Sequence, residues 1–105
     1  MKHKINGRMI DNELVILVDG RMITPGRSQR VINHSPDGFS AGYLGSGVAQ
    51  SALAIMLSLT STETSKKHYQ AFKAEFLSNP EYFNNDFEFE VDLDAWIAEQ
   101  DKTLI

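Results

Sequence analysis

The chain is organised around residues 38–59, GFSAGYLGSGVAQSALAIMLSL, where a glycine-punctuated segment leads into the most apolar run of the sequence. Between residues 48 and 59 the only polar side chains are Gln50, Ser51 and Ser58. A helix of this composition is apolar on nearly all sides, and such a helix is buried. Twelve residues fall well short of the roughly 20 that span a bilayer. We therefore expect this helix to form the centre of a protein core.

The glycines before this run predict where the helix begins. Gly47 is the expected N-cap, and Gln50 stands where its side chain can reach back to the N–H of the cap. The Gly45-Ser46-Gly47 turn also presents backbone N–H groups at the positive end of a helix, which is how proteins often hold anions. The lysine and hydroxyl of a P-loop are missing, so a purely structural turn is the plainer interpretation.

Two short stretches before the central run have the pattern of β-strands. Residues 13–18 are rich in β-branched side chains, and Asp19-Gly20 then leads into residues 21–24, which predicts a hairpin. Residues 4–9 predict a further extended segment, with a turn at Asn6-Gly7.

The segments between the hairpin and the central helix are less regular. Residues 27–32 are expected to form either a loop or a short extended piece. Residues 39–43 are expected to return as a strand of the same antiparallel sheet, after the turn at Asp37-Gly38.

Residues after the central run predict a second helix. Thr60-Ser61-Thr62 is a polar break suited to a helix start. From residue 62 to 77, aromatic and aliphatic side chains recur at three- and four-residue spacing, which indicates an amphipathic helix.

The last part of the chain predicts a strand and a short helix. Residues 87–91, FEFEV, alternate strictly, so Glu88 and Glu90 should face water. Asp92 or Asp94 then caps a short helix that ends near Lys102, followed by frayed terminal residues. The expected fold is a single α+β domain over residues 1–105, in which a small, mostly antiparallel sheet packs on a buried central helix, an amphipathic helix and a short C-terminal helix.

Composition limits the classes of function. The 105 residues include 42% hydrophobic residues and no cysteine, which excludes disulfides and thiolate metal sites. No apolar run follows the basic N-terminus, so we expect a cytoplasmic protein without a membrane contact. Residues 1–40 carry six Lys/Arg against four Asp/Glu, and residues 41–105 carry four against ten. This acidity argues against direct nucleic-acid binding.

A set of motifs around the central run resembles an uncharacterised family of small domains. They are Asn33-His34-Ser35-Pro36, Gly38-Phe39, Gly42-Tyr43, Gly45-Ser46-Gly47 and Ala49-Gln50. The family is carried largely by bacteria, archaea, phages and plasmids, so the resemblance implies a mobile-element background and no particular activity. Ala41, Leu44 and Val48 depart from the family pattern, which usually has Trp, Gly and Pro at these positions.

Charged residues suggest two interaction surfaces. Glu88, Glu90, Asp92 and Asp94 form a line of negative charge that could imitate a phosphate backbone or enter a basic cleft. Arg27 and Arg30 lie in the segment after the hairpin, where guanidinium groups can meet phosphate or carboxylate. For both sets a solvated surface is the plainer interpretation.

Two functional hypotheses follow. The first is a non-enzymatic protein of a mobile element or phage that binds another protein, for example a nucleic-acid-binding protein with a basic cleft, and inhibits a host defence nuclease in the manner of an anti-CRISPR. It requires no cofactor and no metal. The alternative is a domain that binds a small ligand, nucleotide or phosphate, using Gly45-Ser46-Gly47 with His34 and an arginine such as Arg30.

Overall fold

The computed structural model describes residues 1–103, and the fraying expected at the chain end falls on residues outside this range. The elements are, in chain order, β1 (His3–Ile10), β2 (Glu13–Val18), β3 (Arg21–Ile23), α1 (Gly26–Val31), α2 (Ser46–Leu59), α3 (Thr62–Phe72), a π-helix (Lys73–Leu77), a 3₁₀-helix (Pro80–Tyr82), β4 (Phe87–Val91) and α4 (Leu93–Thr103).

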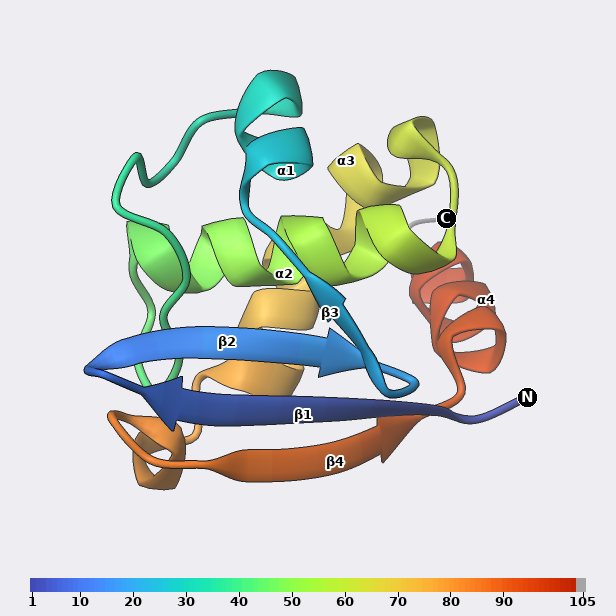
Figure 1. Ribbon diagram of the computed structural model, residues 1–105. Coiled ribbons are helices and arrows are strands. Elements are labelled where there is room, and N and C mark those ends of the chain that lie inside the picture. The colour runs from blue at the N-terminus through green and yellow to red at the C-terminus, as the bar shows by residue number, and fades with distance from the viewer. Residues whose placement is uncertain (104–105) are drawn as a thin grey trace.

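The four strands form one antiparallel sheet in the order β3-β2-β1-β4 (Figure 1). Asp11-Asn12 and Asp19-Gly20 make the two tight turns, and all four residues have positive φ, as two-residue hairpins of type I′ require. β4 comes from the far end of the chain and completes the sheet beside β1, with Glu90 opposite Lys4. The predicted α+β class, the Asp19-Gly20 hairpin and the late strand are confirmed.

The turn predicted at Asn6-Gly7 is wrong, because both residues lie inside β1, opposite Leu17 and Ile16 of β2. Gly7 is instead required for packing. The ring of Phe87 occupies the space that a Cβ on Gly7 would need. A glycine inside a strand often marks such a close approach, and here it lets the Phe87 ring of β4 pack against β1.

α2 forms the centre of the core, as predicted. Every residue from 47 to 57 is buried, and Leu53, Ile55 and Met56 are completely shielded from solvent. Burying each such side chain contributes about 1.5–3 kcal/mol. Along the described part of the chain, none of the helices has the length and apolar character needed to cross a membrane.

Aromatic side chains join the second helix to β4 and α4. The Phe76 ring stacks on Phe89 with centroids 5.7 Å apart, and Trp96 meets Phe72 edge-on at 5.6 Å. The helix predicted over residues 62–77 is present, but its last turn widens into the π-helix. Ser61 caps its start by accepting a hydrogen bond from the Thr64 N–H (3.1 Å).

Residues 26–31 form helix α1, so the loop or extended piece expected over residues 27–32 is wrong. Pro25 precedes the helix, and its carbonyl oxygen accepts hydrogen bonds from the Gln29 N–H (2.9 Å) and the Ser28 hydroxyl (2.7 Å). The fixed φ of proline favours such a helix start. A helix of six residues is too short for the helical period to show in the sequence.

The strand expected over residues 39–43 is also wrong, because the backbone of this segment bonds to helices. The Ser40 N–H donates to the Gly47 carbonyl (3.1 Å), and the Gly42 N–H donates to the Leu77 carbonyl (2.8 Å). These contacts use the groups that a sheet ladder would need. The segment is a loop that lies against α2 and the π-helix.

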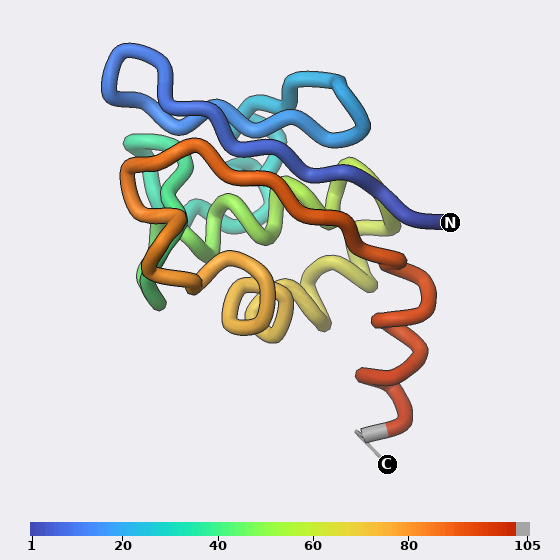
Figure 2. Tube along the Cα trace, turned by 90° about the horizontal axis from the view of Figure 1, so that it is seen from below, coloured from blue at the N-terminus to red at the C-terminus, as the bar shows by residue number. Residues whose placement is uncertain are grey.

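All four helices lie on one side of the sheet, so the outer sheet face is uncovered (Figure 2). One row of paired residues on that face runs across the strands from Met22 through Leu17 and Asn6 to Glu88. The row shows a division of the face, in which β3 and β2 present apolar side chains and β1 and β4 present polar or charged ones.

Candidate functional site

A hollow of about 290 Å³ opens at one end of the sheet. It lies between the first half of β2, the end of β3, the loop over residues 37–41 and the segment over residues 82–84. This is the end of β2 where β3 no longer runs beside it, because β3 pairs only with residues 16–18.

Leu14 places unpaired backbone groups in this hollow. In an antiparallel sheet, residues alternate between pointing their N–H and C=O toward one neighbouring strand and toward the other. Ile10 and Glu13 flank a two-residue turn and bond to each other, so Leu14 points its N–H and C=O away from β1. The next strand residue on that side would be Pro25, which has no N–H and already belongs to the start of α1. No described residue bonds to the N–H or C=O of Leu14.

The opposite edge of the same hairpin, at Met9, is closed by a side chain. β4 pairs with β1 only as far as Gly7, so the N–H of Met9 would be open in the same way. The Asp86 carboxylate accepts a hydrogen bond from the Met9 N–H (2.7 Å) and closes that position. Of two equivalent open positions in one hairpin, the fold therefore caps Met9 and leaves Leu14 uncapped.

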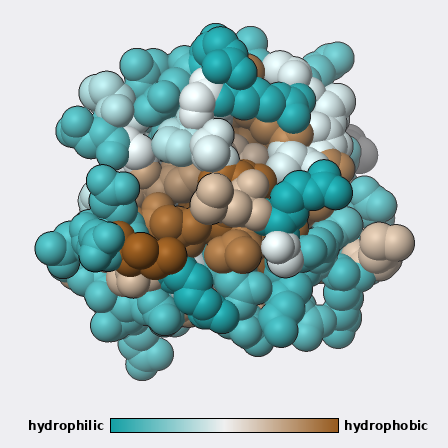
Figure 3. Space-filling model, in the orientation of Figure 1, coloured by the Kyte–Doolittle hydropathy of each residue, from teal (hydrophilic) through white to brown (hydrophobic). Residues whose placement is uncertain are grey.

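Apolar, polar and acidic side chains surround the hollow. Met22 is 60% exposed and Phe83 is 52% exposed, large values for such side chains. Figure 3 shows hydrophobic side chains gathered in the middle of this view, over the region where β2 lies below α2 in Figure 1. Glu13 and Asp37 are the charged side chains among the described lining residues. Uncharged polar side chains, those of Asn12, Thr24, Ser40 and Asn84, also line it. The hollow thus combines apolar and polar side chains in similar measure with an acidic rim.

Gln50 holds the loop that leads to the hollow. Its side-chain oxygen accepts hydrogen bonds from the N–H groups of His34 (2.7 Å) and Ser35 (2.9 Å), and its Nε2 donates to Ser28 Oγ (2.8 Å) and the Ile32 carbonyl (3.1 Å). The expected capping role of Gln50 is therefore wrong. A fully buried amide satisfies its hydrogen bonds wherever partners lie, and here the loop backbone supplies them.

Gly42 fixes the other side of the loop. It has φ of 95°, and a Cβ at this position would lie 2.5 Å from the backbone nitrogen of Phe83. Glycine allows both the left-handed backbone and the close approach. This contact brings the loop over residues 37–41 beside Phe83, so that together they form one wall of the hollow.

The predicted anion-binding residues are placed at the start of α2. The helix begins at Ser46 with Gly45 as its N-cap, so the expected Gly47 cap is wrong. The Tyr43 ring lies beside Gly45, and the Ser40 side chain lies beside Gly47. His34 is a half-buried residue whose Nε2 lies 2.6 Å from the Tyr69 hydroxyl of α3.

The acidic residues of β4 lie on the outer sheet face, but Glu88 is engaged within the protein. It accepts a hydrogen bond from Asn6 Nδ2 (2.9 Å) and lies 3.4 Å from Lys4 Nζ. The Asn6 hydrogen bond and the Lys4 ammonium lower the pKa of Glu88 below its ordinary value. Glu90 is exposed on the same strand.

Asp92 and Asp94 lie at the start of α4, not on β4. Asp92 accepts a hydrogen bond from the Ala95 N–H (3.2 Å), which lowers the pKa of the Asp92 carboxyl and makes it the cap. The N-terminal ammonium of Met1 lies 3.5 Å from its other oxygen. Asp94 is exposed in the first turn of α4.

The two predicted basic residues lie on α1. Arg27 and Arg30 are both exposed there. Arg27 also lines a second, smaller hollow of about 250 Å³ on the other side of β3, with Met22 and Ala54. The structure thus places the arginines on a helix above α2, separate from the acidic residues of the sheet (Figure 1).

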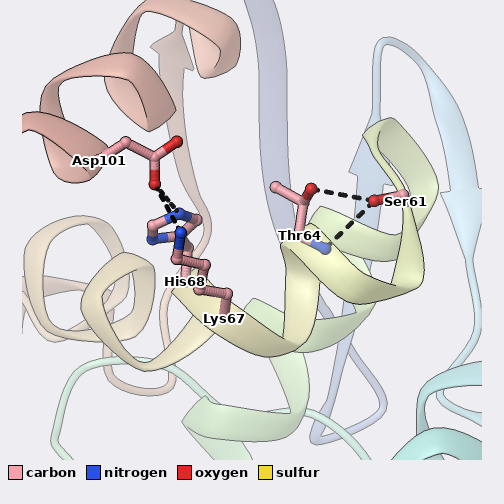
Figure 4. A network of polar contacts seen from close by, with 5 residues as sticks. All are labelled: Ser61, Thr64, Lys67, His68 and Asp101. Atoms are coloured by element: carbon pink, nitrogen blue, oxygen red, sulfur yellow. Dashed lines mark hydrogen bonds and ion pairs between the residues drawn. The ribbon is translucent and has the colours of Figure 1, made fainter. Parts of the chain in front are cut away.

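A buried histidine links α3 to α4, which the sequence did not indicate (Figure 4). His68 is 3% exposed, and its Nε2 lies 2.9 Å from Asp101 Oδ1. Lys67 donates to the same oxygen (3.1 Å), and this contact is the main cause that lowers the pKa of Asp101. Within residues 1–103, no group of three or more His, Asp or Glu side chains could hold a metal ion. We therefore interpret this cluster as a structural link between helices.

Sequence reasoning missed the open position at Leu14, although one signal was present. Pro25 follows β3 after a single residue, and a proline ends strand pairing because it cannot donate to the ladder. This explains why β3 has only three residues. It also explains why the first half of β2 has no neighbouring strand on that side.

The fold and the hollow define a small α+β domain with an uncovered sheet face and an unpaired strand position at Leu14. The chain belongs to a family of unknown function, DUF6166, whose model matches residues 5–99. Comparison with curated proteins and with solved structures gave no significant match.

Proposed function

We propose that this protein is a non-enzymatic interaction domain that binds a segment of another protein in the hollow beside β2. The observation that carries the proposal is the unpaired N–H and C=O of Leu14 in a hollow that also holds exposed apolar side chains. Unpaired backbone groups at a strand edge are a ready template for another chain. Apolar side chains around them, such as Met22 and Phe83, supply area that a partner can bury.

A narrower proposal concerns the biological setting. The motif resemblance and the net charge of −4 support a protein of a mobile element or phage that inhibits a host defence nuclease. Glu90 and Asp94 are the residues that could present charge to a basic cleft, since Glu88 and Asp92 already make contacts within the chain. The acidic surface is therefore smaller than the sequence suggests.

The alternative proposal, binding of a nucleotide or phosphate at Gly45-Ser46-Gly47, is supported by the backbone N–H groups at the start of α2. The side chains of Tyr43 and Ser40 pack against the two glycines of this turn, which also gives the glycines a structural role. The hollow beside β2 offers more groups for recognition, so we favour protein binding.

Site-specific photocrosslinking tests the proposed function. A benzophenone amino acid replaces Met22, which is exposed beside the hollow, and in a matched variant it replaces Lys66, which is exposed on α3. In cells of the native host, Met22 variants should give discrete adducts with a protein and Lys66 variants should not. Equal labelling at both positions, or none at Met22, would contradict the proposal.

A further inference from the structure

We infer that the partner segment binds as an added β-strand along the uncapped edge at Leu14 and places a basic side chain between Glu13 and Asp37. This inference rests on the proposed function and names the partner for the same site. The occupant is an extended segment of a different protein, with apolar residues beside a Lys or Arg.

The backbone of Leu14 sets the mode of binding. An extended segment can accept from its N–H and donate to its C=O, which continues the sheet in the space where β3 ends. β3 already pairs with residues 16–18, so the added strand is short and lies end to end with β3. Because backbone bonds alone carry no sequence preference, specificity must come from the side chains of the segment.

Other strand edges are less suited to strand addition. The free edge of β4 carries the charged side chains of Glu88 and Glu90, and β3 is only three residues long. Charged side chains and short strands are the devices by which proteins discourage pairing at edges. Asp86 closes the remaining position at Met9. Leu14 combines open backbone groups with a hollow that has space for an added segment and holds exposed apolar side chains.

The side chains around Leu14 define the chemistry of the partner. Side chains of an added strand alternate between two faces, so one set would enter the hollow toward Phe39 and Ala41. The rim charges, Glu13 and Asp37, are both acidic and both exposed. Complementary potentials favour a basic residue at the rim.

Charge also distinguishes a foreign segment from a second copy of this chain. The longest free edge that a second copy could offer is β4, whose outer side chains Glu88 and Glu90 are acidic. Bringing that edge to Glu13 and Asp37 would set like charges side by side, which disfavours association. We therefore assign the hollow to a different protein with a basic extended segment.

Peptide selection followed by amide hydrogen exchange tests the inference. Random short peptides displayed on yeast are selected against the full chain, and the most enriched peptide is synthesised. In the free protein, the Leu14 amide should exchange faster than the amides of Ile16 and Val18, which face β3. With the peptide bound, exchange at Leu14 should slow by about tenfold or more, as expected for a new backbone hydrogen bond.

Two double variants, each of which removes two negative charges, test the role of the rim. Glu13→Gln with Asp37→Asn should weaken binding of a selected Lys- or Arg-containing peptide by about tenfold, and higher salt should reduce the difference. Glu63→Gln with Glu99→Gln, at exposed positions of α3 and α4 that do not line the hollow, should change binding less than about twofold.

Several outcomes would overturn the inference. These are no enriched peptide, a bound peptide that leaves Leu14 exchange unchanged, or an equal loss of binding in both double variants. Protection of Leu14 that grows with protein concentration in the absence of peptide would identify a second copy as the occupant. If Met22 crosslinks to a protein while Leu14 stays unprotected in that complex, the proposed function stands and strand addition is wrong.

Discussion

The side-chain oxygen of Gln50 lies 2.7 Å from the backbone nitrogen of His34, so a buried amide of α2 holds a loop sixteen residues earlier in the chain. The same amide bonds to Ser35, Ser28 and Ile32. This single side chain therefore fixes the position of the loop whose continuation forms one wall of the hollow.

Gln50→Leu should destabilise the fold by about 2–4 kcal/mol, because several buried backbone and hydroxyl groups lose their partner at about 1–3 kcal/mol each and only partly find water. Urea unfolding measures the change. Gln70→Leu, at an exposed position of α3, is the control and should stay within about 0.5 kcal/mol. A neutral Gln50→Leu would show that the amide does not anchor the loop.

Gly7→Ala should lower the free energy of unfolding by about 1–3 kcal/mol or more, because the added methyl group competes with the Phe87 ring for the same space. Gly26→Ala serves as control. Its nearest contact would be the flexible end of Arg30 at 3.6 Å, so this variant should be neutral or slightly stabilising. Equal stability of the two variants would contradict the packing of Phe87 on β1.

Ile55→Asp should abolish the cooperative thermal transition followed by circular dichroism, since Ile55 is completely buried and an unpaired charge there costs several kcal/mol. Ala54→Asp should be milder. Ala54 lines the second hollow, where Arg27 also lies, so the new carboxylate can reach water and a positive charge. Unfolding of both variants to the same extent would show that this hollow is closed in solution.

Stability should decrease as the pH falls below the ordinary aspartate pKa of 3.8, because Asp19 and Asp101 have lowered pKa values in the folded protein. The unfolded chain then binds protons that the folded chain still excludes, so the stabilisation is present above this pH and is lost below it. The main causes are the hydrogen bond from His3 to Asp19 and that from Lys67 to Asp101. Urea unfolding over a pH series should show a smaller acid loss for Asp19→Asn and for Asp101→Asn than for the wild type. An unchanged pH dependence in both variants would contradict these contacts.

Asp86→Ala should expose the Met9 N–H and speed its hydrogen exchange by about tenfold, because the carboxylate that accepts its hydrogen bond is removed. Exchange at Leu14 should not change. If Met9 stayed protected, the closing of this edge by Asp86 would be wrong, and the difference between the two edges would disappear.

The sequence by itself determined the class of fold and most of its elements. The apolar run over residues 48–59 has no solvent-facing side, so burial as a central helix follows from composition alone. Asp19-Gly20 and the strict alternation of residues 87–91 are equally local signals, because positive φ and the period of two are properties of neighbouring residues. These predictions are confirmed.

Only the tertiary structure decided how glycines, amides and short segments are used. The local sequence predicts a turn at Asn6-Gly7, but in the structure Gly7 makes room for the Phe87 ring. The local sequence also predicts a capping role for Gln50, but in the structure its side chain bonds to the loop backbone. The open edge at Leu14 depends on where β3 stops and on Asp86 capping Met9 from a distant part of the chain. Each of these features is a contact between segments far apart in sequence, and local patterns carry no information about which distant group will occupy a given space.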